Sequence, residues 1–349
     1  MKRMVIELTN RCNLSCKHCF DERHAATGCL PLEIIDRVLA EGMQCNVAHL
    51  SFTGGEPTLH PDFAEIVKRV CDAAGYTFSL VTNGSTFPHL YPLFVQSRAC
   101  FKGATFSLDG AREETHDRLR GAGSFRQVMR AASICVVKDL PFTINMVVTA
   151  QNHSEIEEMI QLAARLGSRG ARFGHLMPTP DTALRKLDLT PEERQSVEGR
   201  IWGLQKSSSV AIGMSPGYYS ESPFFPCGPL ELQEFNLDHR GNLTLCCQLS
   251  GYSGENGGED IVANLRDMGL PEACARFQDR VGTYLADKQE AIRQGNFTAL
   301  DHFPCWYCVK YLDKTSDLRR IPGHAWTNWK GSLQGGKNNG STAPTIAST

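Results

Sequence analysis

The sequence has no apolar stretch approaching the roughly 20 residues that a transmembrane helix needs, and its charged N-terminus lacks the apolar core of a signal peptide. It also has no long basic run, and the formal net charge of its 349 residues is −2. This charge balance gives no electrostatic argument for a nucleic-acid partner. We therefore expect neither a membrane nor a nucleic acid among its partners, and we expect a cytoplasmic protein.

Cysteine, in contrast, is plentiful, with 14 residues. In a small secreted domain this number would indicate disulfides, but here the chain is large and several cysteines cluster in spacings typical of metal ligands. These features favour reduced thiols and metal binding. The remaining cysteines on helix-like segments are expected to be small packing residues, namely Cys45, Cys71, Cys135 and Cys274, whereas Cys29 and Cys100 have no assigned role.

Three cysteines, Cys12, Cys16 and Cys19, lie close together directly after the apolar run 4–9. Three thiolates can hold three irons of a [4Fe-4S] cube and leave its fourth iron open. An open coordination position distinguishes a reactive metal site from a closed structural one. A zinc site completed by His18 is the alternative, but structural zinc usually has paired C-x2-C knuckles or a His pair. The spacing therefore favours a cluster.

A second motif, Gly54-Gly55-Glu56-Pro57, follows the apolar run 49–53. Glycines at such a position let the backbone approach a ligand, and a glutamate can accept hydrogen bonds from an ammonium group. By itself this motif would be an ordinary loop.

Together, the cysteine triplet and the glycine pair resemble the radical S-adenosylmethionine (AdoMet) superfamily. Further matching stretches occur in the family's order at the ends of apolar runs, and they are Thr82-Asn83-Gly84, Ser107-Leu108-Asp109-Gly110 and the segment 116–125. The resemblance covers residues 1 to about 180. It implies an enzyme that cleaves AdoMet reductively to a 5′-deoxyadenosyl radical, which removes a hydrogen atom from an unactivated C–H bond of the substrate.

The resemblance also implies a role for each matching residue. Cys12, Cys16 and Cys19 would ligate a [4Fe-4S] cluster whose open iron chelates the amino and carboxylate groups of AdoMet. The segment Gly54–Glu56 would bind the methionine amine. The other candidates for cofactor binding are His18 and Phe20 on the adenine side, and Asn83, Ser107, Asp109 and His175 at the ends of later strands.

Strand-like and helix-like segments alternate along the first 180 residues. The predicted strands, rich in β-branched or aromatic residues, are Val5–Leu8, His49–Thr53, Thr77–Thr82, Ala104–Leu108, Phe142–Thr149 and Ala171–Leu176. The predicted helices include Pro31–Cys45, Pro61–Ala74, Ser124–Lys138 and Ser154–Leu166, the last with a capping box of Ser154 and Glu157.

Six βα units predict a parallel sheet that curls into a partial (β/α)6 TIM barrel, with ligands at the carboxyl ends of its strands. Six units rather than eight would leave an open side for a substrate. Because 349 residues exceed a typical single core, we expect an appended unit as well. The predicted division is 1–210 for the barrel, 211–320 for a second domain, and 321–349 for a polar, mobile tail.

The second domain carries another set of cysteines. A β-hairpin with a turn at Gly241 is predicted over 234–246, and a long helix over 271–295. The spacing resembles the abbreviated auxiliary-cluster domain called twitch, whereas the longer SPASM form would add cysteines after Cys308. The resemblance implies one auxiliary [4Fe-4S] cluster on Cys227, Cys246, Cys305 and Cys308. A structural zinc on the same four cysteines remains the alternative.

Cys247 stands beside a predicted ligand and has three interpretations. It replaces Cys246 as a ligand, it donates a hydrogen atom to the substrate radical, or it is a buried apolar residue. A free Cys247 fits epimerisation as the catalytic outcome, whereas a fully ligated auxiliary cluster fits oxidation of the substrate radical.

The twitch and SPASM groups resemble enzymes that modify ribosomally made peptides, so the leading hypothesis is a peptide substrate that is cross-linked, oxidised or epimerised. Because Cys12 leaves no room for a peptide-recognition domain before the barrel, recognition would need a separate protein or the barrel itself. An electron donor such as flavodoxin or ferredoxin is also expected. The alternatives are a small-molecule dehydrogenase acting on an aminocyclitol or sugar alcohol, and a non-catalytic Fe–S or zinc-stapled carrier, against which the Gly-Gly-Glu motif argues.

Overall fold

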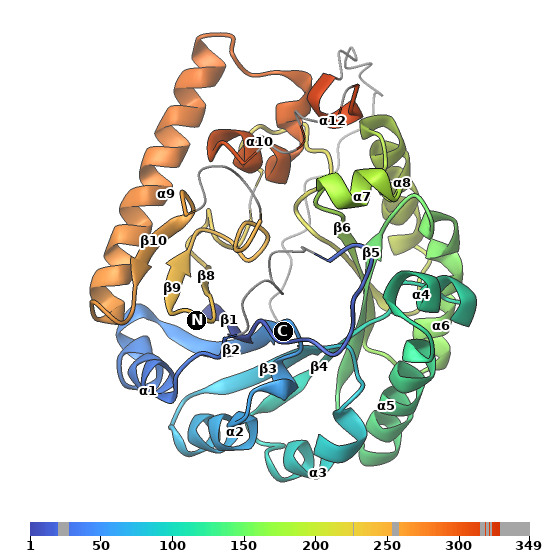
Figure 1. The fold of residues 1–349 in the computed structure, drawn as a ribbon, viewed down its shortest axis with the longest axis vertical. Coiled ribbons are helices and arrows are strands. Elements are labelled where there is room, and N and C mark those ends of the chain that lie inside the picture. Colours follow the sequence, from blue (N-terminus) through green and yellow to red (C-terminus); the bar gives the residue numbers. More distant parts are fainter. Residues whose placement is uncertain are drawn as a thin grey trace.

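The structure is a computed structural model that describes residues 1–19, 28–225, 227–252, 258–314, 318, 321 and 323–328. Its strands form one ten-stranded sheet in the order β10-β9-β8-β1-β2-β3-β4-β5-β6-β7. Their bounds are β1 (Lys2–Thr9), β2 (Val47–Gly54), β3 (Thr77–Thr82), β4 (Phe101–Ser107), β5 (Phe142–Val148), β6 (Gly170–His175), β7 (Ala211–Met214), β8 (Glu234–Leu237), β9 (Asn242–Thr244) and β10 (Ile261–Asn264). The sheet is strongly curved, with helices along its outer side (Figure 1).

The helices are α1 (Leu32–Glu41), α2 (Phe63–Asp72), α3 (Phe87–Gln96), α4 (Glu113–Arg120), α5 (Ser124–Lys138), α6 (Ile156–Arg165), α7 (Pro180–Leu184), α8 (Pro191–Gln205), α9 (Leu270–Arg293), α10 (Pro304–Tyr311) and α12 (Ala325–Asn328). Strands β1 to β7 are all parallel to their neighbours. All six predicted strands are present, and the predicted partial barrel is confirmed. Strand β7 is an additional parallel strand that the sequence pattern did not reveal, because it is only four residues long.

Alternation along the strands separates two faces of the sheet. In β3, Phe78, Leu80 and Thr82 are buried, whereas the residues between them are only partly buried. The buried set packs against the outer helices, where the rings of Phe94 and Phe101 stack with centroids 4.8 Å apart. The opposite, interior face of the sheet is thus left to the other residues of each strand.

The capping box predicted for Ser154 and Glu157 is wrong. Helix α6 begins at Ile156 after a short 3-10 turn, and its N-cap residue, Glu155, makes no capping hydrogen bond with its side chain. The Glu155 carboxylate instead accepts a hydrogen bond of 2.8 Å from the backbone N–H of Ala111. A tertiary contact has therefore replaced the local cap.

The predicted hairpin is present as β8 and β9, which pair antiparallel across a turn at Gly241. It does not form a separate sheet, because β8 also pairs in parallel with β1. The predicted long helix corresponds to α9, a 24-residue helix that packs along β10 and α1. The sheet therefore continues across the predicted boundary near residue 210, and the division into domains stays a prediction.

Most of the predicted tail, 329–349, lies outside the described residues. Within the described part of that segment, Trp326 is buried, and its indole N–H donates a hydrogen bond of 2.8 Å to the carbonyl of Leu189. Its ring also packs against Phe303, with centroids 4.9 Å apart.

One expectation about the cysteines is wrong, because Cys71 is not a simple packing residue. It forms a disulfide with Cys100, which joins α2 to the start of β4. The expectation of reduced thiols therefore does not hold for this pair. Among the helices of the described residues, none combines the length and the apolar character needed to cross a lipid bilayer.

Candidate active site

The loop after β1 carries Cys12, Cys16 and Cys19, three half-buried cysteines. Burial raises the pKa of the Cys16 thiol to about 11, against the effect of Arg120. Cys19 and Cys12 contribute to the rise, so the three thiols lie within electrostatic reach of one another. The described residues contain no group of three or more His, Cys, Asp or Glu side chains arranged around a single metal ion.

Two polar side chains from other elements point at the sulfur atoms of this loop. The Arg120 guanidinium lies 3.8 Å from Cys16 Sγ, and the Asn83 amide nitrogen lies 4.0 Å from Cys12 Sγ. N–H donors at these positions stabilise thiolates. The donor set of the loop therefore fits the ligands of an anionic iron–sulfur cluster.

The structure explains why residues 54 and 55 are glycines, which the sequence did not reveal. A Cβ on Gly54, whose φ is +137°, would lie 2.1 Å from the carbonyl oxygen of Thr9, and one on Gly55 would lie 2.2 Å from that of Arg11. The Gly55 N–H donates to the Thr9 carbonyl at 2.8 Å. The glycines thus let the end of β2 lie directly against the cysteine loop, whereas their predicted contact with a methionine amine stays a prediction.

Glu56 is fully buried and joins the ends of two strands. Its carboxylate accepts hydrogen bonds from the Thr58 hydroxyl at 2.6 Å, the Thr82 hydroxyl at 2.8 Å and the Asn83 N–H at 2.8 Å. Burial raises its pKa, and these hydrogen bonds oppose the rise. Among the described residues, its Oε2 atom receives a bond from Asn83 alone and retains acceptor capacity, so a bond from an ammonium group is compatible with this geometry.

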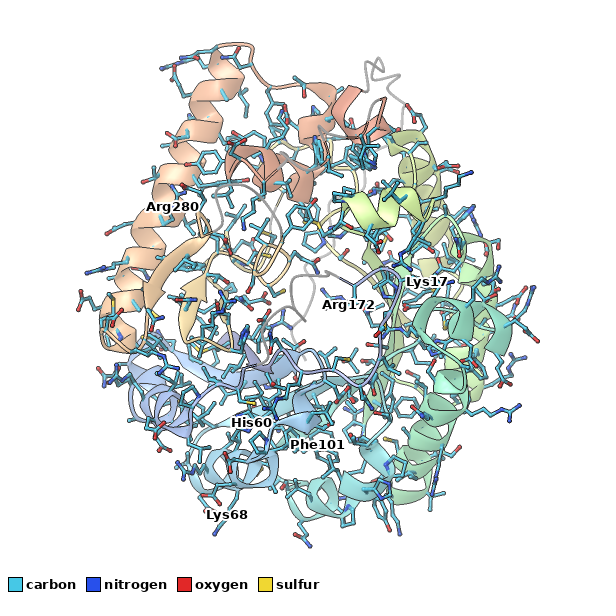
Figure 2. The ribbon with its side chains drawn as sticks, in the orientation of Figure 1. Lys17, His60, Lys68, Phe101, Arg172 and Arg280 are labelled. Atoms are coloured by element: carbon cyan, nitrogen blue, oxygen red, sulfur yellow. A yellow bond between two sulfur atoms is a disulfide. The ribbon has the colours of Figure 1, made fainter. Side chains whose placement is uncertain are left out.

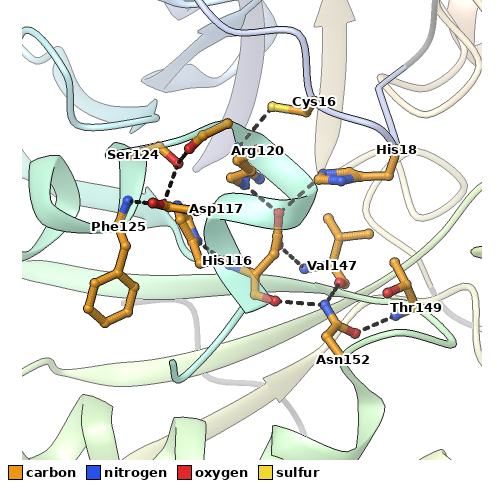
Figure 3. Close-up of polar contacts among 12 residues, drawn as sticks. Cys16, His18, His116, Asp117, Arg120, Ser124, Phe125, Val147, Thr149 and Asn152 are labelled. Carbon is orange, nitrogen blue, oxygen red and sulfur yellow. Dashed lines mark hydrogen bonds and ion pairs between the residues drawn. The ribbon is translucent and has the colours of Figure 1, made fainter. Parts of the chain in front are cut away.

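Asp109 is the centre of a buried polar network, and its partners His18, Arg120 and Val147 are labelled in Figure 3. Its Oδ2 atom pairs with the Arg120 guanidinium and lies 3.2 Å from Nε2 of His18, and its Oδ1 atom accepts the Val147 N–H at 2.8 Å. Burial alone would raise the pKa of Asp109, but Arg120 and His18 lower it below its usual value. Asp109 was predicted to bind cofactor. In the structure it connects α4, β5 and the cysteine loop through these contacts.

His18 is the member of this network that comes from the cysteine loop. Burial lowers the pKa of its imidazole to about 4, so the ring is neutral near pH 7. A neutral ring that faces the Asp109 carboxylate donates from Nε2, which leaves Nδ1 as an acceptor. That atom is buried and has no hydrogen-bond partner within the described part of the chain. The predicted adenine contact of His18 remains a prediction, and Phe20 lies outside the described residues.

The remaining predicted cofactor residues lie at the ends of three strands. Asn83 is buried, and its amide donates to Asn13 Oδ1 at 2.9 Å. Ser107 is half-buried at the end of β4. His175, at the end of β6, is buried, and its Nδ1 lies 2.7 Å from Ser215 Oγ. Asn83 therefore adjoins the cysteine loop, whereas His175 is held by the segment after β7.

Sequence reasoning missed Arg120, although the matching stretch 116–125 contained it. Burial would lower the pKa of its guanidinium, but Asp109 and Cys16 raise it above the ordinary value, so it stays charged. A buried arginine in the otherwise very polar helix α4 gives no periodic signal. Only its tertiary contacts identify it.

The second group of predicted ligands is also brought together. Burial raises the pKa of Cys305 well above its ordinary value, and Cys308, Cys227 and Cys247 raise it further. The side chains of Cys246 and Cys247 form a hydrogen bond with each other, which raises the pKa of Cys246. The Tyr284 hydroxyl from α9 lies 3.2 Å from Cys308 Sγ. The four predicted ligands and Cys247 thus lie within electrostatic reach of one another, and a metal site on them stays a prediction.

Residues 6–163 match the family model described as the radical SAM superfamily. The chain contains a radical SAM domain. This match confirms the resemblance drawn from the cysteine triplet and the Gly-Gly-Glu motif, and with it the expectation of an enzyme.

The radical SAM domain has curated relatives. The chain is 32% identical over 218 residues to an AdoMet-dependent heme synthase of Methanosarcina barkeri, and this match covers 59% of the chain and 59% of the synthase. It is 28% identical over 262 residues to a PqqA peptide cyclase of a Methylobacterium species, which covers 70% of the chain and 66% of the cyclase. The chain therefore spans less than two thirds of the length of these relatives.

A solved structure has the same fold. SuiB of Streptococcus suis, bound to the precursor peptide SuiA, aligns with a TM-score of 0.62 over 78% of this chain and 64% of its own. The sequence identity is 16%, so the likeness concerns the fold alone. It agrees with the curved parallel sheet and the partial barrel described above.

Proposed function

We propose that this radical SAM protein cleaves AdoMet reductively and uses the resulting radical to modify a peptide. The observation that carries the proposal is the loop after β1, where N–H donors of Arg120 and Asn83 lie near the sulfur atoms of Cys16 and Cys12. When bound, the [4Fe-4S] cluster supplies the electron that breaks a carbon–sulfur bond of AdoMet and yields a 5′-deoxyadenosyl radical for hydrogen abstraction.

The residues of the chain hold this site in place. Asp109 fixes the Arg120 guanidinium beside Cys16, and so keeps a positive charge next to an anionic thiolate. Glu56 ties the Gly-Gly-Glu loop to the end of β3. Because these contacts come from β2, β3 and the segment after β4, the carboxyl ends of several strands form one rigid site, as enzymes with barrel folds require.

The test of AdoMet cleavage uses protein reconstituted with iron and sulfide under anaerobic conditions. Incubation with AdoMet and dithionite should release 5′-deoxyadenosine, measured by liquid chromatography and mass spectrometry. Changing Cys12, Cys16 or Cys19 to Ala should abolish the release. Cys29→Ala is the matched control, because Cys29 is also a half-buried free thiol near this loop. Release that persists in all three triplet variants would refute the proposal.

A peptide substrate is supported by the PqqA peptide cyclase, the relative whose match covers more of this chain. Co-expression with a short peptide encoded beside the protein should change that peptide. A loss of two mass units indicates cross-linking or oxidation, and an unchanged mass with deuterium uptake from solvent indicates epimerisation. A recognition protein and a flavodoxin or ferredoxin are the proposed further partners. The proposed location is cytoplasmic, because an open cluster is sensitive to oxygen.

A second candidate is a small-molecule substrate, which the AdoMet-dependent heme synthase favours, since its match has the higher identity. The discriminating observation is whether AdoMet cleavage by the purified enzyme is stimulated by the neighbouring peptide or by small molecules alone.

We further propose an auxiliary [4Fe-4S] cluster on Cys227, Cys246, Cys305 and Cys308. Reconstituted protein should then hold about eight iron atoms per chain, whereas about four iron atoms and one zinc ion would indicate a structural zinc site. Cys305→Ala should spare cleavage of AdoMet but lower turnover of the substrate. Cys247 is proposed as the hydrogen-atom donor if the product is an epimer, and Cys247→Ala should then stop epimerisation.

A further inference from the structure

Three polar residues form a row across the interior face of the sheet. The register pairs Ser107 of β4 with Asn145 of β5, and Asn145 with Arg172 of β6. Paired residues of parallel strands share a face, and the residues next to them in sequence, such as Phe106 and Phe173, are buried on the helix side. The three polar side chains therefore lie together on the interior face.

The polar groups of these three side chains have no partner among the described residues. Within the described residues, the Ser107 hydroxyl, the Asn145 amide and the Arg172 guanidinium make no hydrogen bond, and Arg172 has no ion pair. Arg3, the other arginine on this face, differs, because its Nε donates to Glu234 at 2.9 Å. Within the described residues, Arg172 is thus a cation on this face that has no ion pair.

Arg172 is exposed, but it is exposed toward the inside of the curved sheet (Figure 2). Surrounding protein lowers the pKa of its guanidinium, as does Arg3, while Glu234 and Cys247 raise it. These three residues belong to β1, β8 and the segment after β9, on the other side of the barrel from β6. The guanidinium therefore projects into the interior, within electrostatic reach of the predicted auxiliary site.

The strand beyond Arg172 leaves space for a ligand. The register partner of Arg172 on β7 is Gly213, which has no side chain, and even an added Cβ there would only reach ordinary contact, 3.7 Å from Arg172 Cγ. Arg172 is exposed to this interior and has no ion pair within the described residues, so its guanidinium is available to a ligand. An anion from outside the chain is the ligand that matches its charge.

We propose that Arg172 and Asn145 bind a carboxylate of the substrate. A guanidinium offers two parallel N–H groups that match the two oxygens of a planar carboxylate, and the Asn145 amide supplies one further donor. A single positive charge suits a monoanion. This inference rests on the proposed function and specifies its substrate class, a molecule with an acidic side chain or a free C-terminus.

The experiment measures how fast the full-length, reconstituted protein is modified by p-hydroxyphenylglyoxal, a reagent for arginine, with each site quantified by peptide mass spectrometry. The probes are N-acetylglutamic acid α-amide for a side-chain carboxylate, N-acetylalanine for a C-terminal carboxylate, and N-acetylglutamine amide as the neutral isostere. One of the two carboxylate probes should slow modification of Arg172, whereas the neutral probe should not. The probe that protects Arg172 shows whether the bound carboxylate is a side chain or a C-terminus.

Asn145→Asp is the decisive variant, because it keeps Arg172 but places a carboxylate opposite it. The intramolecular pair should slow modification of Arg172 without any probe and remove the effect of the probes. Asn145→Ser, which keeps a small neutral side chain, should retain protection at higher probe concentration. Arg98, paired with Asp139 on the surface, provides the internal control, and its modification should not respond to any probe.

Two results would overturn the inference. Equal effects of the carboxylates and the neutral probe would show that Arg172 does not select an anion, and protection by AdoMet alone would assign the site to the carboxylate of the cofactor. Measurement of 5′-deoxyadenosine in the same samples reports separately on the proposed function. Loss of protection with intact AdoMet cleavage therefore refutes only the inference.

Discussion

At the scale of single residues, close backbone contacts determine how the Gly-Gly-Glu loop lies against the cysteine loop. The cysteine triplet and the glycine pair identified the family. The role of the glycines was taken from their freedom to approach a ligand, whereas in the structure they accommodate the carbonyl oxygens of Thr9 and Arg11. Contacts between distant segments decide such roles, and a sequence pattern does not contain them.

The glycine contacts give a prediction about stability. Gly55→Ala should destabilise the protein by about 2 to 4 kcal/mol, because its Cβ would overlap the backbone of the cysteine loop and no flexible side chain can yield. Gly203→Ala is the control. Its Cβ would meet no atom within 4 Å on α8, so it should stabilise by about 0.5 to 1 kcal/mol. Urea unfolding followed by circular dichroism measures both, and two effects of the same sign would contradict this account.

Arg120 gives a second prediction. Arg120→Gln should destabilise the protein by about 3 to 5 kcal/mol, because it leaves the buried Asp109 carboxylate without its ion pair. The double variant Arg120→Gln with Asp109→Asn should recover much of this loss, since it removes both buried charges. Thermal unfolding of the protein without iron and sulfide measures the stability of both variants independently of the cluster. If the double variant is less stable than the single one, the ion pair is not the main contribution.

Glu198 gives a prediction about pH. Burial raises the pKa of this carboxyl group to about 7 from its ordinary 4.5, against hydrogen bonds from Trp202 and the Tyr219 N–H. The folded state therefore holds this proton more tightly than the unfolded state, so the group favours folding below pH 4.5, and this contribution is lost as the pH rises to 7. Glu198→Gln should flatten the pH dependence in that window, as measured by urea unfolding at several pH values. Glu192→Gln, on the first turn of the same helix, is the control.

At the scale of elements, periodicity is clearest in β3 and β5, which bury alternate residues, whereas most residues of β1 and β2 are buried. Helix α5 was predicted with its observed bounds, Ser124–Lys138. Helix α3 was missed. It contains Pro88 at its start and Pro92 inside, and both residues usually mark turns, but the aromatic contacts of Phe87 and Phe94 outweigh this local preference.

At the scale of the whole molecule, the predicted change of pattern near residue 210 does not coincide with a break in the sheet. Strand β8 pairs with β1 from Arg3↔Glu234 to Ile6↔Leu237, so the hairpin that carries the predicted auxiliary site continues the barrel. Local patterns identify a hairpin but not the strand beside which it lies. This pairing joins residues more than 200 positions apart, and only the structure reveals it.

The continuity of the sheet predicts that its two parts unfold together. Hydrogen exchange measured by mass spectrometry should give similar protection for the amides of β1 and β8. Glu234→Ala removes the partner of Arg3 and should lower protection in both strands, by about 1 kcal/mol because Arg3 is partly exposed. Glu272→Ala, which breaks the exposed pair with Arg276 on α9, should leave both unchanged. If β8 alone loses protection while β1 keeps it, the hairpin is an independent unit, and the division near residue 210 describes the folding of this chain better than its continuous sheet does.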